Sequence, residues 1–359
     1  MNGDRTTQTR RGTRTQSGSD DATGTSLRSQ ESLSLAIAVV AFILAALLAI
    51  PVFRLQHVPI AGDGSIGQYA AISGAVVAIL AFVAGRYVVR SRDARIGVLD
   101  VIDVGALCLA HAVIALLSWT LLAEILERGF VGAEVFSFPT LILAGAAAAV
   151  TAYVAFLSAA RMSLSLLAIV LAAFLIQGVL ASTLTASDPH WWEENLSALG
   201  MTDDLSALAF NLTLIVAGVL VTALARAATN GVPNPNPRGT VRVRTCLIIV
   251  GVFLALVGVF PVDRFFAIHN TVASGMVVAF GVLVFMLRRW IPGIPRAFVF
   301  LGWLFIGVIV LLAVFFAVGF YTLTAVELVA GILVFTWIIL FIRNAAALAA
   351  DTARVRSGG

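Results

Sequence analysis

The 359 residues are 60% apolar and only 12% charged, with a mean hydropathy of +1.02. Soluble domains carry about a quarter charged residues, so this composition excludes an ordinary soluble globular protein. The formal charge of +4 comes from Arg alone, since the chain has no Lys, and the Arg residues flank apolar segments, which favours anionic lipid over nucleic acid as their partner.

Residues 1–30 are rich in Ser, Thr, Gly and Arg and contain almost no aliphatic side chain. Such a segment cannot bury enough apolar surface to fold, so we expect a disordered cytoplasmic tail. The first long apolar run, residues 33–53, exceeds the length of a typical signal-peptide core. We therefore interpret it as a membrane anchor.

Nine further apolar segments follow, and at 1.5 Å per residue each is long enough to cross a hydrocarbon core of about 30 Å as a helix. They span residues 68–89, 101–123, 138–159, 164–184, 205–225, 243–260, 265–287, 297–320 and 323–342. The predicted fold is all-α, a polytopic membrane helix bundle with ten transmembrane helices arranged as 4 + 6. The four-helix region covers residues 31–160, the six-helix module 161–344, and a cytoplasmic tail 345–359.

The Arg residues alternate along the chain. Twenty of the 23 lie in the N-terminal tail, the even-numbered connections and the C-terminal end, and only Arg54, Arg128 and Arg264 lie in odd-numbered connections. Cytoplasmic loops carry the excess of positive charge in membrane proteins. The pattern predicts a protein of the cell membrane with both termini in the cytoplasm.

Several local features refine this bundle. Residues 232–237 contain three Pro and predict an extended cytoplasmic linker. Small residues such as Gly145 with Ala149, and Gly251 with Gly258, have the spacing of close helix packing. Cys108 and Cys246 lie far apart within predicted helices, so we interpret both as small packing residues.

The third apolar segment carries Cys108, His111 and Ser118 on about one face. We expect His111 to bond to a neighbouring helix rather than to act in catalysis. Asp100 and Asp103, at the cytoplasmic end of that segment, are expected to pair with the Arg residues of the second connection.

The fifth connection is the longest one on the outer side and the richest in polar residues. It combines Asp188, His190 and Glu194 with Trp191 and Trp192, the pairing of charge and aromatic rings that is typical of a membrane interface. We expect this stretch to lie on the outer surface.

Four polar residues near the outer ends of later segments predict a pocket beneath this loop: Asn211, Asp263, His269 and Glu327. An ionisable residue within a membrane segment is a functional candidate, since its burial is costly without a partner. Three interpretations remain open. His190, His269 and Asp263 are candidates for binding a divalent metal that activates water; the cluster binds a lipid headgroup or small solute; or a His–acid pair closes the end of the bundle.

The motif Asn195-Leu196-Ser197-Ala198-Leu199-Gly200 is followed by Phe210-Asn211, Gly218, Gly258-Val259-Phe260-Pro261-Val262-Asp263 and His269. In these residues the C-terminal half, about residues 162–344, resembles the six-helix DUF 998 family, whose function is unknown. A more distant likeness connects it to DRAM- and Sfk-type membrane proteins, which implies a role in lipid handling. The family often has an acidic residue where this chain has Ala198, and Glu327 matches one near the start of its last helix.

The chain contains no phosphate-binding Gly-Lys-Ser/Thr loop and no nucleophile elbow, so no cofactor is predicted. The sequence favours a non-enzymatic membrane protein that binds lipid or a small solute at its outer polar cluster. The expected partners are membrane lipids and a lipid or small-molecule ligand, and no nucleic acid. The alternatives are a secondary transporter, and a metal-assisted lipid hydrolase or transferase of the outer leaflet.

Overall fold

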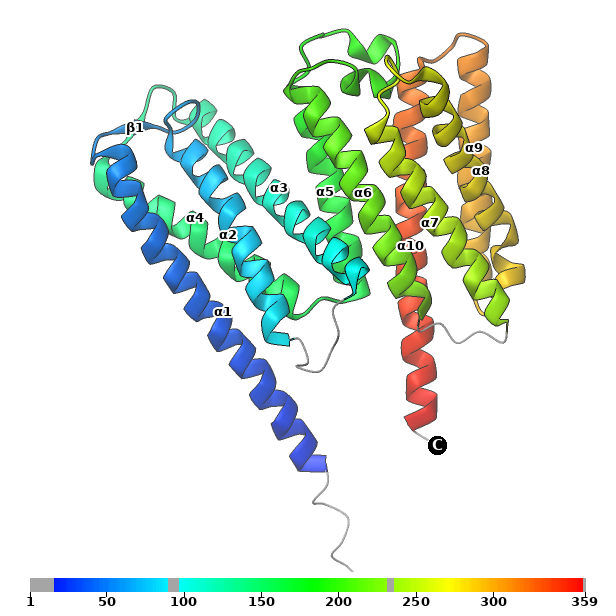
Figure 1. The fold of residues 1–359 in the computed structure, drawn as a ribbon, viewed down its shortest axis with the longest axis horizontal. Helices are drawn as coiled ribbons and strands as arrows, with labels where there is room; N and C mark the ends of the chain where they lie inside the picture. Colours follow the sequence, from blue (N-terminus) through cyan, green and yellow to red (C-terminus); the bar gives the residue numbers. More distant parts are fainter. Residues whose placement is uncertain (1–15, 90–96, 231–235, 358–359) are drawn as a thin grey trace, which may run out of the picture.

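The computed structural model describes residues 16–89, 97–230 and 236–357, and these residues form ten helices long and apolar enough to cross a membrane (Figure 1). The prediction of an all-α membrane bundle is therefore confirmed. The helices are α1 (Gln16–Phe53), α2 (Ile66–Val89), α3 (Val98–Gly129), α4 (Ser137–Ala160), α5 (Leu164–Leu184), α6 (Leu205–Asn230), α7 (Pro237–Val259), α8 (Phe266–Trp290), α9 (Arg296–Ala317) and α10 (Leu323–Ser357).

Two helices extend beyond their expected ends. Helix α1 begins at Gln16, so residues 16–30 are helical where an unstructured tail was expected, and α10 continues to Ser357. Adding residues to an existing helix requires no new nucleation, so a polar or Ala-rich flank continues a membrane helix readily. Residues 1–15, the start of the predicted tail, lie outside the described residues.

The last residue of the predicted Pro-rich linker is helical. Pro237 is the first residue of α7, and the Asn236 side chain caps that helix by accepting a hydrogen bond from the Gly239 N–H at 3.1 Å. Proline suits the first turn of a helix because the missing N–H would have no partner there. Residues 231–235 lie outside the described part of the chain.

The first four helices pack as one bundle, in which α4 lies along α1 and α2, and α3 lies along α2 (Figure 1). Their interface consists of small side chains, since Ala144, Ala148 and Ala152 are fully buried. A Cβ atom on Gly145 would lie 2.9 Å from Phe42, so the expected close packing at this glycine is confirmed. A short antiparallel pair, β1 (Val58–Pro59) with β2 (Glu134–Val135), joins two connections at one end of this bundle.

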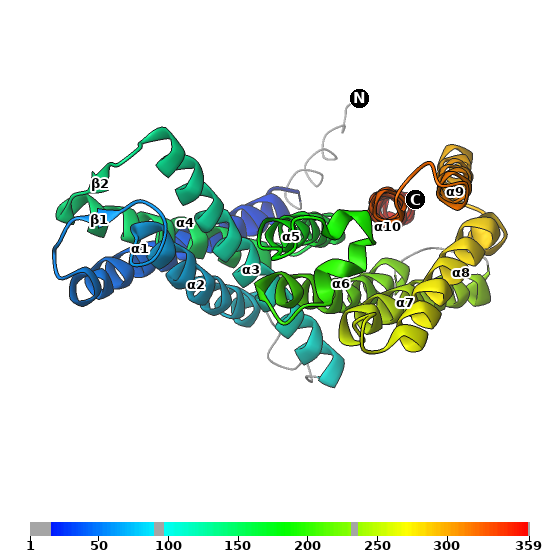
Figure 2. The ribbon, with the colours of Figure 1, turned by 90° about the horizontal axis from the view of Figure 1, so that it is seen from above.

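The last six helices form the second bundle. Helices α5, α6, α7 and α8 pack in series, α10 lies against α5, and α9 lies against α8 and α10 (Figure 2). Gly251 and Gly258 both face α6, as their spacing predicted. The core centres on the fully buried Trp337, whose ring stacks on Phe298 with the centroids 5.0 Å apart.

Helix α3 joins the two bundles by packing against α5 and α6. At one end of this contact, Arg226 of α6 forms an ion pair with Asp103 at 2.5 Å. Asp103 therefore pairs with an Arg of α6 that the sequence did not indicate, and its expected pairing with the second connection stays a prediction. Asp100 instead accepts a hydrogen bond from the Gly97 N–H at the start of α3. Arg90, Arg92 and Arg95 lie outside the described residues.

Candidate functional site

The connection between α5 and α6 caps one end of the second bundle. It contains two short 3₁₀ helices, η1 (Trp191–Glu193) and η2 (Leu196–Gly200), which pack against each other and against the start of α10. Ala198, Leu199 and Gly200 are buried, so η2 is an integral part of this end rather than a loose loop. We call this part of the molecule the capped end.

His269 holds η2 against α7 and α8. The imidazole is only 5% exposed, with Nε2 3.1 Å from the Ser197 hydroxyl and Nδ1 2.7 Å from the Phe260 carbonyl oxygen. Because a carbonyl oxygen only accepts, Nδ1 carries the proton, and in the neutral ring the Ser197 hydroxyl donates to Nε2. Phe260 ends α7, so His269 also satisfies a carbonyl that this helix leaves unpaired.

Glu327 holds the same segment from the other side. Its Oε2 accepts a hydrogen bond from the Leu196 N–H at 2.6 Å, which links the start of α10 to the residue before Ser197. Two side chains from distant parts of the sequence therefore fix the Asn195–Gly200 motif in place.

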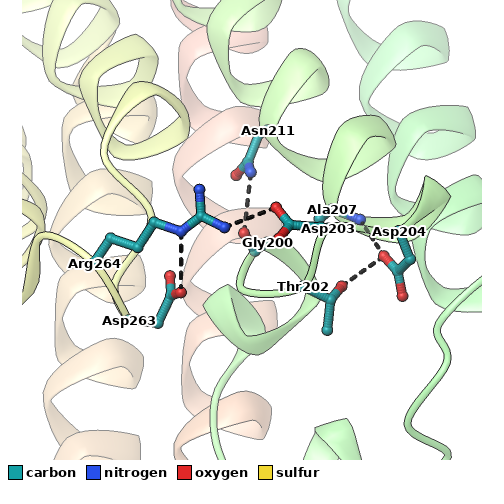
Figure 3. Close-up of polar contacts among 8 residues, drawn as sticks. All are labelled: Gly200, Thr202, Asp203, Asp204, Ala207, Asn211, Asp263 and Arg264. Carbon is teal, nitrogen blue, oxygen red and sulfur yellow. Dashed lines mark hydrogen bonds and ion pairs between the residues drawn. The ribbon is translucent and has the colours of Figure 1, made fainter.

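An open cleft of about 560 Å³ lies beside this network, between η2, the start of α6 and the connection before α8 (Figure 3). Its apolar wall includes Leu205, Leu208 and Pro261, and its polar wall includes Asn211 and Arg264. Leu205 and Leu208 are each 62% exposed. The cleft therefore offers both apolar and polar contacts near the end of a membrane-spanning helix.

Arg264 is the positively charged residue among those that line this cleft. Its guanidinium lies 2.7 Å from Asp203 and its Nε lies 3.6 Å from Asp263, as Figure 3 shows. Asn211 points into the same region, where its amide donates to the Gly200 carbonyl oxygen at 3.1 Å. A Cβ atom on Gly200 would lie 2.5 Å from the Asn211 Oδ1, so only glycine permits this approach.

Asp204 caps the start of α6. Its carboxylate accepts hydrogen bonds from the Ser187 and Thr202 hydroxyls, each at 2.6 Å, and from the Ala207 N–H at 2.9 Å. These bonds favour the ionised form and lower the pKa of Asp204 to about 2. Asp203 and Asp204 therefore line the cleft, and Asp203 and Asp263 are the two carboxylates that contact its guanidinium.

The predicted pocket is divided in two by the structure. Asn211 lines the cleft, and Asp263 reaches it through Arg264. His269 and Glu327 instead belong to the buried contacts behind η2. The four residues thus gather at one end of the bundle but do not face a single cavity.

The loop residues of the prediction lie apart from both groups. Asp188 accepts from the His190 N–H at 2.8 Å, and both side chains are more than half exposed. Glu194 is also exposed. The three metal candidates, His190, His269 and Asp263, are not brought together, and no group of three His, Cys, Asp or Glu side chains suited to a metal ion occurs within residues 16–89, 97–230 and 236–357.

Four residues of this end were missed as site residues from the sequence: Ser197, Asp203, Asp204 and Arg264. Arg264 carried a signal, since it is one of only three Arg residues outside the predicted cytoplasmic face. Asp204 directly precedes a helical apolar run, which is the position of an N-cap. Ser197 belongs to the Asn195–Gly200 motif, but its contact with His269, 72 residues away, could not be read from that motif.

His111 in the first bundle is buried and has the same kind of contacts. Its Nε2 lies 2.8 Å from the Ser158 hydroxyl of α4, and its Nδ1 lies 2.8 Å from the Leu107 carbonyl oxygen. Both side chains are buried. The prediction that His111 bonds to a neighbouring helix is confirmed. Ser118 instead accepts from Gln177 of α5, and Cys108 and Cys246 are free thiols.

Comparison with known proteins identifies the second bundle. Residues 166–344 match the family model described as "Protein of unknown function (DUF998)", from within α5 to within α10. No curated protein and no solved structure matches the chain. The likeness to DRAM- and Sfk-type proteins stays a prediction.

Proposed function

Given that residues 166–344 form a DUF998 domain within a membrane protein, we propose that the cleft beside Arg264 binds a ligand with a positively charged amine, such as the headgroup of a zwitterionic lipid. This role needs no cofactor and no bond-making step. It places the capped end on the outer side of the cell membrane, with both termini in the cytoplasm.

The charge balance of the cleft supports the proposal. Asp203 and Asp263 contact the guanidinium of Arg264, and the ionised Asp204 lines the same cleft, so an excess of negative charge remains after Arg264 is paired. An anionic ligand would meet net repulsion there, whereas an amine would meet attraction. Arg264 can still contact the phosphate of a zwitterionic headgroup.

The exposure of these groups supports exchange with a ligand. The Arg264 and Asp203 side chains are 56% and 86% exposed, and ion pairs of this kind contribute only about 0–1 kcal/mol. A ligand can therefore replace one partner at little cost. Leu205 and Leu208, which line the same cleft, provide apolar surface for the start of an acyl chain.

The orientation follows from the arginines. An even number of spans supports termini on one side of the membrane, and α1 begins and α10 ends at the same end of the molecule (Figure 1). Most of the Arg residues that the structure describes lie at or near the helix ends on that side, which the positive-inside rule assigns to the cytoplasm. The cleft then faces outward, where Trp191 and Trp192 sit at the interface.

Lipid retention in native mass spectrometry tests the proposal. Protein purified from vesicles of equal phosphatidylethanolamine and phosphatidylglycerol should retain the ethanolamine lipid preferentially. The double change Asp203→Asn with Asp263→Asn should lower that retention roughly tenfold, which corresponds to about 1.4 kcal/mol. Asp188→Asn, an exposed acid of the same connection outside the cleft, should leave it unchanged.

A second arm distinguishes a lipid from a free solute. Ethanolamine and choline added to detergent-purified protein should raise the melting temperature if the amine alone is recognised, and should do nothing if the acyl chains are required. Equal retention of both lipids, together with no response to either amine, would contradict the proposal.

A further inference from the structure

Glu327 lies in the first turns of α10, partly buried at the capped end. Its hydrogen bond comes from the Leu196 N–H, and no Arg or His within the described residues forms an ion pair with it. A carboxylate within a membrane segment is costly to bury unless a positive charge or several donors compensate it. A single hydrogen bond from a backbone N–H offsets only a small part of the cost of burying this carboxylate.

Two buried oxygens beside this carboxylate have no hydrogen-bond partner among the described residues: Asn195 Oδ1 and Thr324 Oγ1. Thr324 is only 6% exposed. Buried polar atoms in native proteins almost always have a partner, so two orphans near one carboxylate require an explanation. The oxygen of an Asn amide only accepts, so its partner must be a donor or a cation.

Chain geometry places these oxygens close to Glu327. Asn195 directly precedes Leu196, whose N–H contacts Glu327 Oε2, so the Asn195 Cα lies within about 5 Å of that oxygen. Thr324 lies three residues before Glu327 on the same helix, a spacing that brings Cβ atoms to about 5–6 Å. The three residues therefore lie next to one another where η2 meets the start of α10.

We propose that Glu327, Asn195 and Thr324 bind a monovalent metal cation, with Na⁺ as the ion that fits best. The three ligands are all oxygens, which hard cations prefer over nitrogen or sulfur. A single carboxylate neutralises one positive charge, whereas a divalent ion would leave an excess charge at a partly buried site. The partial positive charge at the start of α10 is too small to repel a cation from a full carboxylate.

This site is separate from the cleft and does not depend on the proposed function. None of its three ligands lines the cleft around Arg264. An ion bound here would tie η2 to α10, next to the contacts that His269 makes from α8. Its main effect would be on the stability of the capped end.

Thermal unfolding of the full-length protein in detergent tests the site. NaCl replaced by choline chloride at constant ionic strength should lower the melting temperature by several degrees, in a saturable manner. Glu327→Gln, which keeps the shape and the acceptor for Leu196, should abolish the Na⁺ response. Thr324→Val should weaken the apparent affinity roughly tenfold, while Glu194→Gln, an exposed acid of the same connection, should behave as the wild type.

Equilibrium binding of ²²Na⁺ to the wild-type protein provides a readout that does not depend on the fold of a variant. About one ion per chain is expected, displaced by excess unlabelled Na⁺ and not by choline. No bound ²²Na⁺ would overturn the proposal, as would a Na⁺ response that persists in Glu327→Gln. Displacement of ²²Na⁺ by Ca²⁺ at far lower concentration would overturn the assignment to a monovalent ion. An infrared band of a protonated Glu327 at neutral pH in the presence of Na⁺ would also overturn the proposal, because a proton would then neutralise the carboxylate instead of the metal ion.

Discussion

Arg226 of α6 donates through one guanidinium nitrogen to both carboxylate oxygens of Asp103 of α3, each at 2.5 Å. The two side chains are 24% and 26% exposed, and they connect the four-helix bundle to the DUF998 domain. A charged contact at this depth is stronger than a surface pair, and the loss of one partner leaves the other without compensation.

Asp103→Asn should therefore destabilise the protein by about 1–3 kcal/mol, seen as a lower melting temperature. Glu127→Gln, an exposed acid of the same helix, is the matched control and should have little effect. The exchanged pair Asp103→Arg with Arg226→Asp should recover part of the loss. Equal melting temperatures for Asp103→Asn and the wild type would show that the pair adds nothing to the contact between the bundles.

The close approach of α6 and α7 depends on two glycines. A Cβ atom on Gly218 would lie 2.4 Å from the Gly251 carbonyl oxygen, and one on Gly251 would lie 2.5 Å from Thr222 Oγ1. Gly218→Ala should force the helices apart and cost about 1–3 kcal/mol, measured by thermal unfolding. Gly281→Ala on α8 has open space around it and should be neutral or slightly stabilising, because alanine favours the helix.

His269→Ala should loosen η2 from the bundle. The change leaves the Ser197 hydroxyl and the Phe260 carbonyl without their partner, at a cost of about 1–3 kcal/mol for each buried group. Amide hydrogen exchange in residues 195–200 should accelerate more than in α3. Asn270→Ala, the exposed neighbour, should leave the exchange unchanged; acceleration in both variants would point to a general loss of stability.

Asp204 should give acid sensitivity to the start of α6. Its folded-state pKa of about 2 lies below the ordinary value of 3.8, so its stabilising effect is complete above pH 3.8 and is lost as the pH falls through about 2. Asp204→Ala should cost about 1 kcal/mol near pH 6 as a lost helix cap. The difference between this variant and the wild type should shrink between pH 4 and pH 2 in thermal unfolding. A constant difference across that range would show that ionisation plays no part.

The membrane fold could be predicted from the sequence because lipid imposes one strong constraint. Long apolar runs must be helices, so all ten spans were anticipated. Helix ends such as Gln16 and Ser357 were missed, since a helix continues into water wherever the flanking residues permit it. Hydropathy does not detect that extension.

The candidate site was only partly predictable for a related reason. Depth along a helix indicated that Asn211, His269 and Glu327 share one end of the bundle, and they do. The direction in which each side chain points depends on helix rotation and on η2, and single-sequence patterns do not determine either. The cleft around Arg264 and the contacts of Ser197 therefore emerged from the structure.

The low burial of helix α9 affects which substitutions the protein can tolerate. Only 17% of its span is buried, against 56% for α6, and Val310, Leu311 and Val314 are all about half exposed. Acyl chains can pack against any nonpolar side chain of similar size. We therefore expect α9 to tolerate many different apolar residues at each position and α6 to tolerate few. Randomised apolar libraries in the two segments would then yield many functional clones in one case and few in the other.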